Sequence, residues 1–194
     1  MAQAFVRKGK KFVGVLDRIE RSVVIDLLDQ TRELVAPEET EKTGDPFTDL
    51  VAGLGDEYDP REVAGRDPVV RRILPDGHRD DPEASAEFRA ATERNLREQK
   101  TRKLTAAIDL LSGVCERESR IELTEGDAVT LMMALADVRL ALGERLGLRT
   151  DEDSLKLHAD LDSEQALEEP RLTLMYYYEF LTWLQETISL ALVD

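Results

Sequence analysis

One short stretch of the chain concentrates side chains that could do chemistry. The segment "RRILPDGHRDD", residues 71–81, brings Asp76, His78, Asp80 and Asp81 close together. Carboxylates and an imidazole can ligate a metal or act as an acid and base pair. However, no second histidine, Glu-x-x-His motif or cysteine pair accompanies them. We therefore predict no catalytic residue, no metal ligand and no cofactor here.

A helix start explains the same residues more simply. Asp81 precedes Pro82 and Glu83, which is the order expected for an N-cap, a first helical position and an acidic first turn. A small-molecule enzyme that uses the Asp/His loop stays as an alternative.

Cys115 is the only cysteine of the chain, in the stretch "SGVCERES". An exposed thiol can be oxidised, so Cys115 is a candidate redox residue. A cysteine without a function is the favoured interpretation. A single cysteine cannot form a disulfide within the chain, and it is typical of a reducing cytoplasm.

Basic residues gather at two places in an otherwise acidic chain. Arg7, Lys8, Lys10 and Lys11 crowd one turn, and six more cations lie within residues 89–103. Such clusters can bind phosphates or an acidic partner, which makes the first four candidate partner-binding residues. The alternative is an edge strand protected by lysines and a helix with ordinary Glu93–Arg97 and Glu98–Arg102 pairs.

The composition argues against nucleic acid as the main partner. The 194 residues carry a net charge of -15, with 35% charged and 42% hydrophobic residues. The hydrophobic fraction can fill the core of one domain spanning residues 1–194. The negative charge opposes DNA and anionic lipid, so direct DNA binding is not expected. The N-terminus lacks the apolar run of a secretory signal, which favours a cytoplasmic location.

The hydrophobic pattern predicts a mainly α fold (α+β), with a small antiparallel sheet. "AFVRKGKKFVGVLD" alternates apolar and basic residues about Lys8-Gly9-Lys10, which predicts a hairpin over residues 4–16. "RIEL", residues 120–123, could add a third strand. Helices are expected at about 17–35, 81–111 and 125–146, after Thr150, and from Pro170 onward. Residues 36–70 are acidic and rich in Pro and Gly, and they read as a surface excursion with at most a short helical piece around "PFTDLVAGL".

Helix 125–146 predicts a structural ion pair. Its leucine stripe should face the core, with Arg139 and Arg145 on the two shoulders. A partly buried guanidinium needs an acceptor, so we expect Arg139 to pair with Asp76, Asp80 or Asp81.

The last helix carries two apolar lines. One line should face the core: Leu174, Tyr177, Leu181, Leu184, Ile188 and Leu192. Leu172, Tyr176, Trp183 and Leu190 lie on another side, and Tyr176, Trp183 and Leu190 are the candidate partner-binding residues among them. This second line is either buried under the hairpin or exposed as an anchor for a protein partner, a second copy in a homodimer included.

Three blocks of the chain resemble a known family. "RILPDGHRDDPEASAEFRAATERNLREQK", "ALADVRLALGERLGL" and "LTWLQE", spaced as they are, resemble an actinobacterial family catalogued as a domain of unknown function. Its genes typically lie beside the gene of the Clp protease adaptor ClpS and near a sulfur-transfer cysteine-synthesis cluster. Its best-known member is described as an oxidative-stress transcriptional regulator that acts with an extracytoplasmic-function sigma factor.

The resemblance implies a regulatory role. We therefore expect a non-enzymatic regulator that acts through protein contacts, with a sigma factor or RNA polymerase as partner. An accessory role in Clp proteolysis is the alternative. Redox sensing by an internal disulfide cannot carry over, because Cys115 has no second cysteine to pair with.

Overall fold

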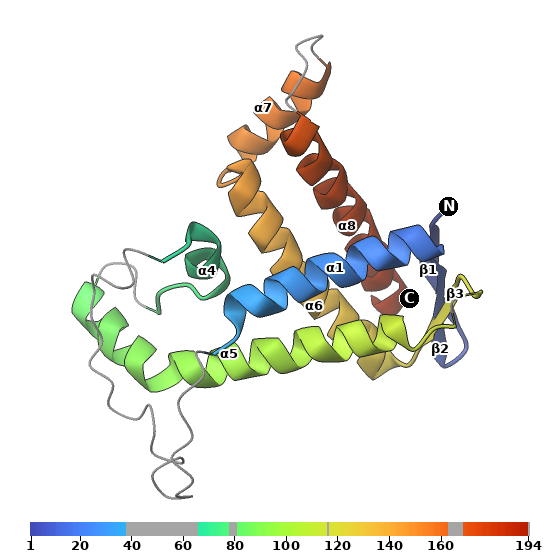
Figure 1. Cartoon of the computed structure of the whole chain (residues 1–194), viewed down its shortest axis with the longest axis horizontal. Coiled ribbons are helices and arrows are strands. Elements are labelled where there is room, and N and C mark those ends of the chain that lie inside the picture. The colour runs from blue at the N-terminus through green and yellow to red at the C-terminus, as the bar shows by residue number, and fades with distance from the viewer. Residues whose placement is uncertain (38–65, 78–80, 116, 163–168, 194) are drawn as a thin grey trace, which may run out of the picture.

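Helices make up most of the molecule, with a small sheet at one end (Figure 1). The computed structural model describes residues 1–37, 66–77, 81–115, 117–162 and 169–193. The elements in chain order are β1 (Gln3–Lys8), β2 (Lys11–Val15), α1 (Arg18–Val35), α4 (Pro68–Ile73), α5 (Pro82–Ser112), β3 (Arg120–Leu123), α6 (Glu125–Leu146), α7 (Asp151–Asp162) and α8 (Glu169–Val193). The predicted mainly α fold with a three-stranded antiparallel sheet is confirmed.

The sheet is a hairpin with a third strand added. Lys8 pairs with Lys11 across a two-residue turn, and Gly9 has a φ of 66°, as the first turn residue of a type II′ hairpin requires. β3 pairs with β2 in antiparallel register, with Phe12 opposite Leu123. At Gly14 the absence of a side chain leaves room for the buried ring of Phe5, because an added Cβ would lie 2.8 Å from that ring.

Side-chain caps set where the helices begin and end. Asp17 forms a capping box with Glu20 at the start of α1, and Thr124 forms one with Asp127 at the start of α6. Gly147, with a φ of 79°, ends α6 in the left-handed conformation that glycine adopts most readily. The boundaries of α1 and α6 lie where the sequence predicts them.

The core surrounds α6, which packs against α1, α4, α5 and α8 (Figure 1). Its predicted apolar stripe is buried: Leu131, Leu135, Val138, Leu142 and Leu146. α8 lies between α6 and β1, and its predicted inward line is buried or partly buried. No helix in the described part of the chain is long and apolar enough to cross a membrane.

The N-terminal half of α5 departs from the prediction. Phe88 is 51% exposed and Ala91 is exposed, although helical spacing predicts that both face inward with Leu104 and Leu111. The reason is position: Arg97 already lies level with the end of α1, where it donates to the Val35 carbonyl oxygen. The residues before it run beyond the end of α1, so α1 cannot cover them (Figure 1). Ser85 and Arg89 are the buried side chains there.

A short helix inside the expected excursion was missed. α4 begins after Asp67, whose carboxylate accepts the Val69 N–H, and has Pro68 at its first position. Val69, Val70 and Ile73 enter the core. The "PFTDLVAGL" piece lies outside the described residues.

Candidate functional site

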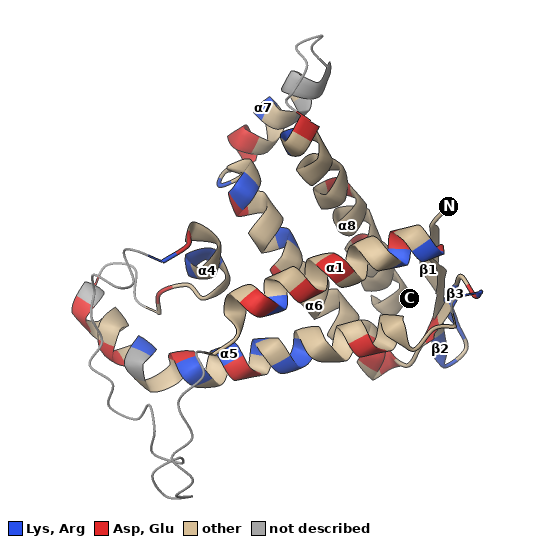
Figure 2. Ribbon diagram, in the orientation of Figure 1, with Lys and Arg blue, Asp and Glu red and all other residues tan. Residues whose placement is uncertain are grey.

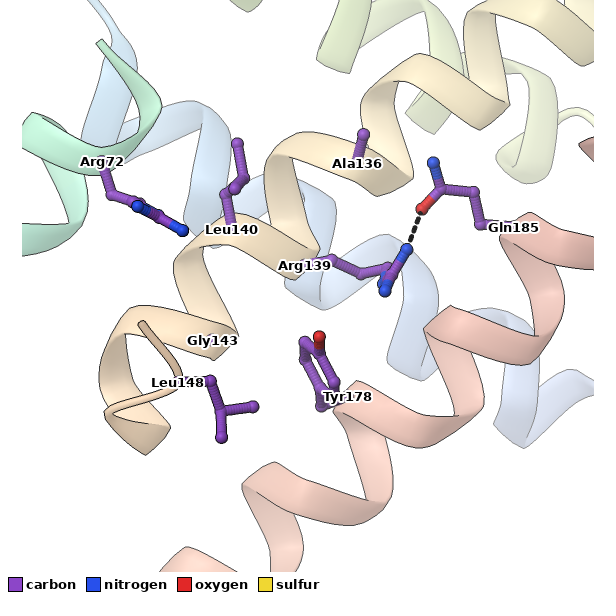
Figure 3. A pocket seen from close by; sticks show the side chains of 8 residues that line it. All are labelled: Arg72, Ala136, Arg139, Leu140, Gly143, Leu148, Tyr178 and Gln185. Carbon is purple, nitrogen blue, oxygen red and sulfur yellow. Dashed lines mark hydrogen bonds between the residues drawn. The ribbon is translucent and has the colours of Figure 1, made fainter. Parts of the chain in front are cut away.

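A pocket opens where α4, α6 and α8 meet (Figure 3). Its volume is about 280 Å³. The lining residues are Arg72, Ala136, Arg139, Leu140, Gly143, Leu148, Tyr178 and Gln185. The two charged side chains among them are both arginines, so the pocket is positive within an acidic protein.

Helical spacing brings these side chains together. Arg139 and Gly143 are one turn apart on α6, and Tyr178 and Gln185 are seven residues apart on one face of α8. Leu148 follows the end of α6, where its N–H donates to the Gly143 carbonyl oxygen at 2.8 Å. Two helices and the turn after α6 therefore form the wall of the pocket.

Arg139 lies between α6 and α8. Its Nη1 donates to Gln185 Oε1 at 2.8 Å, and its guanidinium carbon lies 5.3 Å from the centre of the Tyr178 ring (Figure 3). Its Nε is buried without a hydrogen-bond partner in the described structure. The acceptor of Arg139 is thus an amide and an aromatic face, and no ion pair joins it to a described carboxylate.

Two of the three predicted partners of Arg139 have other contacts. Asp76 pairs with Arg89, and Asp81 caps α5 by accepting the Glu83 and Ala84 N–H groups. Asp80 and His78 lie outside the described residues. The prediction placed the correct arginine at the edge of the core, but it overlooked Gln185 as an acceptor.

Arg72 reaches the pocket from α4, which is fastened to α6. Asp67 accepts a hydrogen bond from Arg145 Nη2 at 2.5 Å. Burial raises the pKa of Asp67, but the hydrogen bonds from Val69 N–H and Arg145 outweigh it and hold that pKa below its usual value. Arg145, on the other shoulder of the stripe, is therefore neutralised, while Arg72 is exposed and makes no ion pair with a described residue.

A second polar cluster surrounds Glu93 on α5. Its carboxylate accepts from Arg66 at 2.6 Å, from Arg89 at 3.0 Å and from Arg97 at 2.8 Å. Burial raises the pKa of Glu93, but the three arginines together lower it to about 2. Arg97 also donates to the Ala36 carbonyl oxygen at 3.3 Å. The cluster therefore links two parts of the chain to α5: the end of α1 at Ala36, and Arg66 just before α4.

Basic and acidic residues are interspersed along α5 (Figure 2). Four of the basic ones form ion pairs with carboxylates at 2.7–3.0 Å: Arg89, Arg97, Lys100 and Lys103. The predicted Glu93–Arg97 pair is present. The predicted Glu98–Arg102 pair is not: the Glu98 carboxylate lies 3.5 Å from Arg94, and Arg102 donates to the Glu98 backbone carbonyl. This helix therefore offers less free positive charge than its composition indicates.

Sequence reasoning missed a buried carboxylate on α6. Asp137 is 4% exposed, and Lys100 and Lys103 of α5 lie 2.7 Å and 2.8 Å from its two oxygens. Lys103 is close enough for an ion pair but not directed for a hydrogen bond. The sequence does contain a signal for this contact. Asp137 is next to Val138 of the leucine stripe, and Lys100 and Lys103 are three residues apart on α5.

The hairpin tip keeps part of its predicted positive charge. Lys11 pairs with Glu122 of β3 at 2.5 Å, and Arg7 lies over the Phe12 ring at 5.7 Å. Lys8 and Lys10 are exposed and make no ion pair with a described residue.

The second line of α8 is divided in the structure. Tyr176 is 61% exposed and Leu190 is 59% exposed. Trp183 is partly buried against the core and stacks on Phe180, with ring centres 6.1 Å apart. Two of the three predicted anchors therefore face solvent, and the third lies at the core edge.

Cys115 is exposed, as a redox role would need. Its backbone carbonyl accepts from the buried Arg21 at 3.4 Å, which ties α1 to the segment before β3. The described residues contain no group of three or more His, Cys, Asp or Glu side chains that could hold a metal ion.

Comparison with known proteins identifies relatives. Over 140 residues the chain is 38% identical to the "Oxidative stress regulator AosR" of Mycobacterium tuberculosis and to that of Mycobacterium bovis. It is 31% identical over 144 residues to the "Putative oxidative stress regulator AosR" of Mycobacterium leprae. These matches cover 66% of this chain and 59% of the length of each relative.

The family comparison covers almost the whole chain. No solved structure shows a significant match. The family model "Domain of unknown function (DUF2017)" matches residues 2–192, so the chain belongs to the DUF2017 family.

Proposed function

We propose that this chain is a non-enzymatic regulator of the response to oxidative stress that acts through protein contacts, with a sigma factor or RNA polymerase as partner. The observation that carries the proposal is the similarity to mycobacterial proteins named oxidative stress regulators. Such a regulator would act in the cytoplasm.

Surface chemistry supports contact with a protein. Tyr176 and Leu190 expose large apolar side chains on α8, beside the partly buried Trp183. Aromatic residues are enriched among the side chains that dominate binding energy. The net charge of -15 suits a partner with a basic face.

Binding of purified components tests the proposal. The chain is immobilised and offered an extracytoplasmic-function sigma factor, core RNA polymerase, or Clp components, at about 0.15 M salt so that weak surface attraction is screened. We expect binding to the sigma factor or the polymerase. Binding to Clp components alone would favour the proteolysis role and contradict the proposal.

Matched variants locate the contact. The double variant Tyr176→Ser, Leu190→Ser is expected to weaken binding by about 2 kcal/mol or more if these residues are anchors. Leu155→Ser is the control, because Leu155 of α7 is 71% exposed and lies outside the proposed surface. Equal loss in both variants would show that the α8 surface is not the contact.

A further inference from the structure

The pocket between α4, α6 and α8 has the chemistry of a ligand site that regulation by protein contacts does not use. We propose that it binds a small organic carboxylate, with the charge on Arg72 and Arg139 and the carbon body against the apolar wall. The inference is independent of the proposed function.

The positive charge of the pocket predicts that its ligand is an anion. Arg72 and Arg139 line the pocket, no acidic side chain does, and neither arginine makes an ion pair with a described residue. By contrast, nearby Arg145 is paired with Asp67. A guanidinium presents a planar set of N–H donors that matches a carboxylate, and Gln185 uses only one donor of Arg139.

The aromatic wall adds a further donor. Tyr178 is partly buried, and its hydroxyl points into the space beside Arg139 (Figure 3). No described residue forms a side-chain hydrogen bond with that hydroxyl; the side-chain hydrogen bond at Tyr178 runs from the Thr182 hydroxyl to the Tyr178 backbone carbonyl oxygen. The ring also holds Arg139 in place by a cation–π contact. A carboxylate bound here could accept hydrogen bonds from the Arg139 guanidinium and from the Tyr178 hydroxyl.

Gly143 indicates that the open space itself has a use. A glycine inside a helix costs roughly 0.5–1 kcal/mol relative to alanine. Gly143 has no positive φ, and an added Cβ would lie 3.7 Å from the Tyr178 ring and 4.0 Å from Leu148 Cβ, which is ordinary contact. Neither backbone conformation nor packing requires glycine there, so what the glycine preserves is volume in the pocket.

Size and lining restrict the ligand class. A volume of about 280 Å³ is small for a peptide segment or a nucleotide, and Leu140, Leu148 and the Tyr178 ring form an apolar wall. A carboxylate on a short aliphatic or aromatic body meets both conditions. Inorganic phosphate would meet only the charge.

Calorimetric titration of the full chain with matched probes tests the proposal. Benzoate and isovalerate are compared with their neutral amides, benzamide and isovaleramide, and with inorganic phosphate. A charge-assisted contact is stronger than a neutral one, so we expect each acid to bind at least about tenfold more tightly than its amide. Equal binding of acid and amide, tighter binding of inorganic phosphate, or no binding by either acid would overturn the proposal.

Three variants assign the binding to this pocket. Arg72→Gln is expected to weaken benzoate binding by about tenfold, whereas Arg71→Gln, its exposed neighbour outside the pocket, changes it less than about twofold. Gly143→Val should weaken binding by filling the pocket, with the fold verified by circular dichroism. If Arg71→Gln and Arg72→Gln weaken binding equally, the attraction is general electrostatics and the pocket is not the site. Failure of these titrations would leave the regulator proposal untouched, because that proposal is tested by protein binding.

Discussion

Glu93 shows how one carboxylate can organise several segments. With its side chain 13% exposed and three arginines around it, its pKa falls from 4.5 to about 2, since the hydrogen bonds from the arginines outweigh the opposing effect of burial. A depressed pKa contributes stability that is complete above the unfolded value and disappears as the pH falls through the folded value. The affected window is therefore about pH 4.5 down to about pH 2.

Replacement of Glu93 should show this pH dependence directly. At pH 7, Glu93→Gln is expected to lower the free energy of unfolding by about 3 kcal/mol, because the shift of the pKa corresponds to that order of energy and three arginines lose their counter-ion. The difference from wild type should shrink as the pH falls from about 4.5 toward about 2. Urea unfolding at several pH values measures it.

Glu98→Gln is the control for this prediction. Glu98 is on the same helix, but its ion pair with Arg94 is about half exposed, so its removal should have little effect. A loss in Glu93→Gln that does not change with pH would contradict the ion-pair explanation.

Asp137 and Arg139, two positions apart on α6, should differ in their effect on stability. Asp137→Ala strands Lys100 and Lys103 in a largely buried site and is expected to cost about 3–5 kcal/mol. Arg139→Ala removes a hydrogen bond to a neutral amide and a cation–π contact, and is expected to cost only about 1–2 kcal/mol. Denaturant midpoints compare the two. An equal or larger loss in Arg139→Ala would mean that Arg139 has a stronger partner.

At the scale of the elements, the hairpin depends on a glycine. The ring of Phe5 covers Gly14 on the neighbouring strand, and a methyl group there would lie 2.8 Å from ring atoms. Gly14→Ala is therefore expected to destabilise the protein by about 1–3 kcal/mol through overpacking. The double variant Gly14→Ala, Phe5→Leu should recover part of this loss, because the smaller side chain makes room. Thermal unfolding of the wild type, the single variant and the double variant measures both effects. If the double variant is no more stable than Gly14→Ala, the strain does not come from the Phe5 ring.

Elements with local signals could be predicted from the sequence. Asp17, Thr124 and Gly147 mark helix ends through short-range hydrogen bonds and backbone conformation, so α1 and α6 appear where their caps and periodicity place them. The hairpin is equally local, because Gly9 alone sets its turn.

What failed to follow from the sequence depends on distant neighbours. Phe88 has helical spacing on α5, but its exposure is decided by where α1 stops. Gln185, the acceptor of Arg139, is 46 residues away in the sequence. No local pattern connects the two, so the sequence does not distinguish Gln185 from the carboxylates of the Asp-rich segment. The pocket needs Arg72 from α4, a helix too short to show periodicity. The site therefore could not be assembled from local patterns.

At the scale of the whole molecule, charge argues against tight DNA binding. A net charge of -15 opposes the counterion release that drives most such affinity. At the hairpin tip, three cations are exposed without an ion pair to a described residue: Arg7, Lys8 and Lys10. We expect no submicromolar binding to promoter duplexes at about 150 mM salt. Fluorescence anisotropy measures this. Sequence-selective binding that is lost in Lys8→Glu, Lys10→Glu would contradict it.

Oxidation should act between molecules and not within one. Cys115 is exposed and is the only cysteine of the chain, so mild peroxide can produce a capped thiol or a disulfide-linked dimer. Non-reducing gels should show monomer, or a dimer that Cys115→Ser abolishes. A peroxide-dependent function that persists in Cys115→Ser would show that this thiol is not the sensor.

The Glu93 cluster also bears on how the family can change over evolution. Arg97 donates to the Ala36 carbonyl oxygen, and Arg66 and Arg97 both bind the Glu93 carboxylate, so Ala36 and Arg66 are held at one point of α5. The loss of any one member of this cluster leaves a partly buried charge of another without its partner. Arg66, Glu93 and Arg97 are therefore expected to vary together among relatives, and not one at a time.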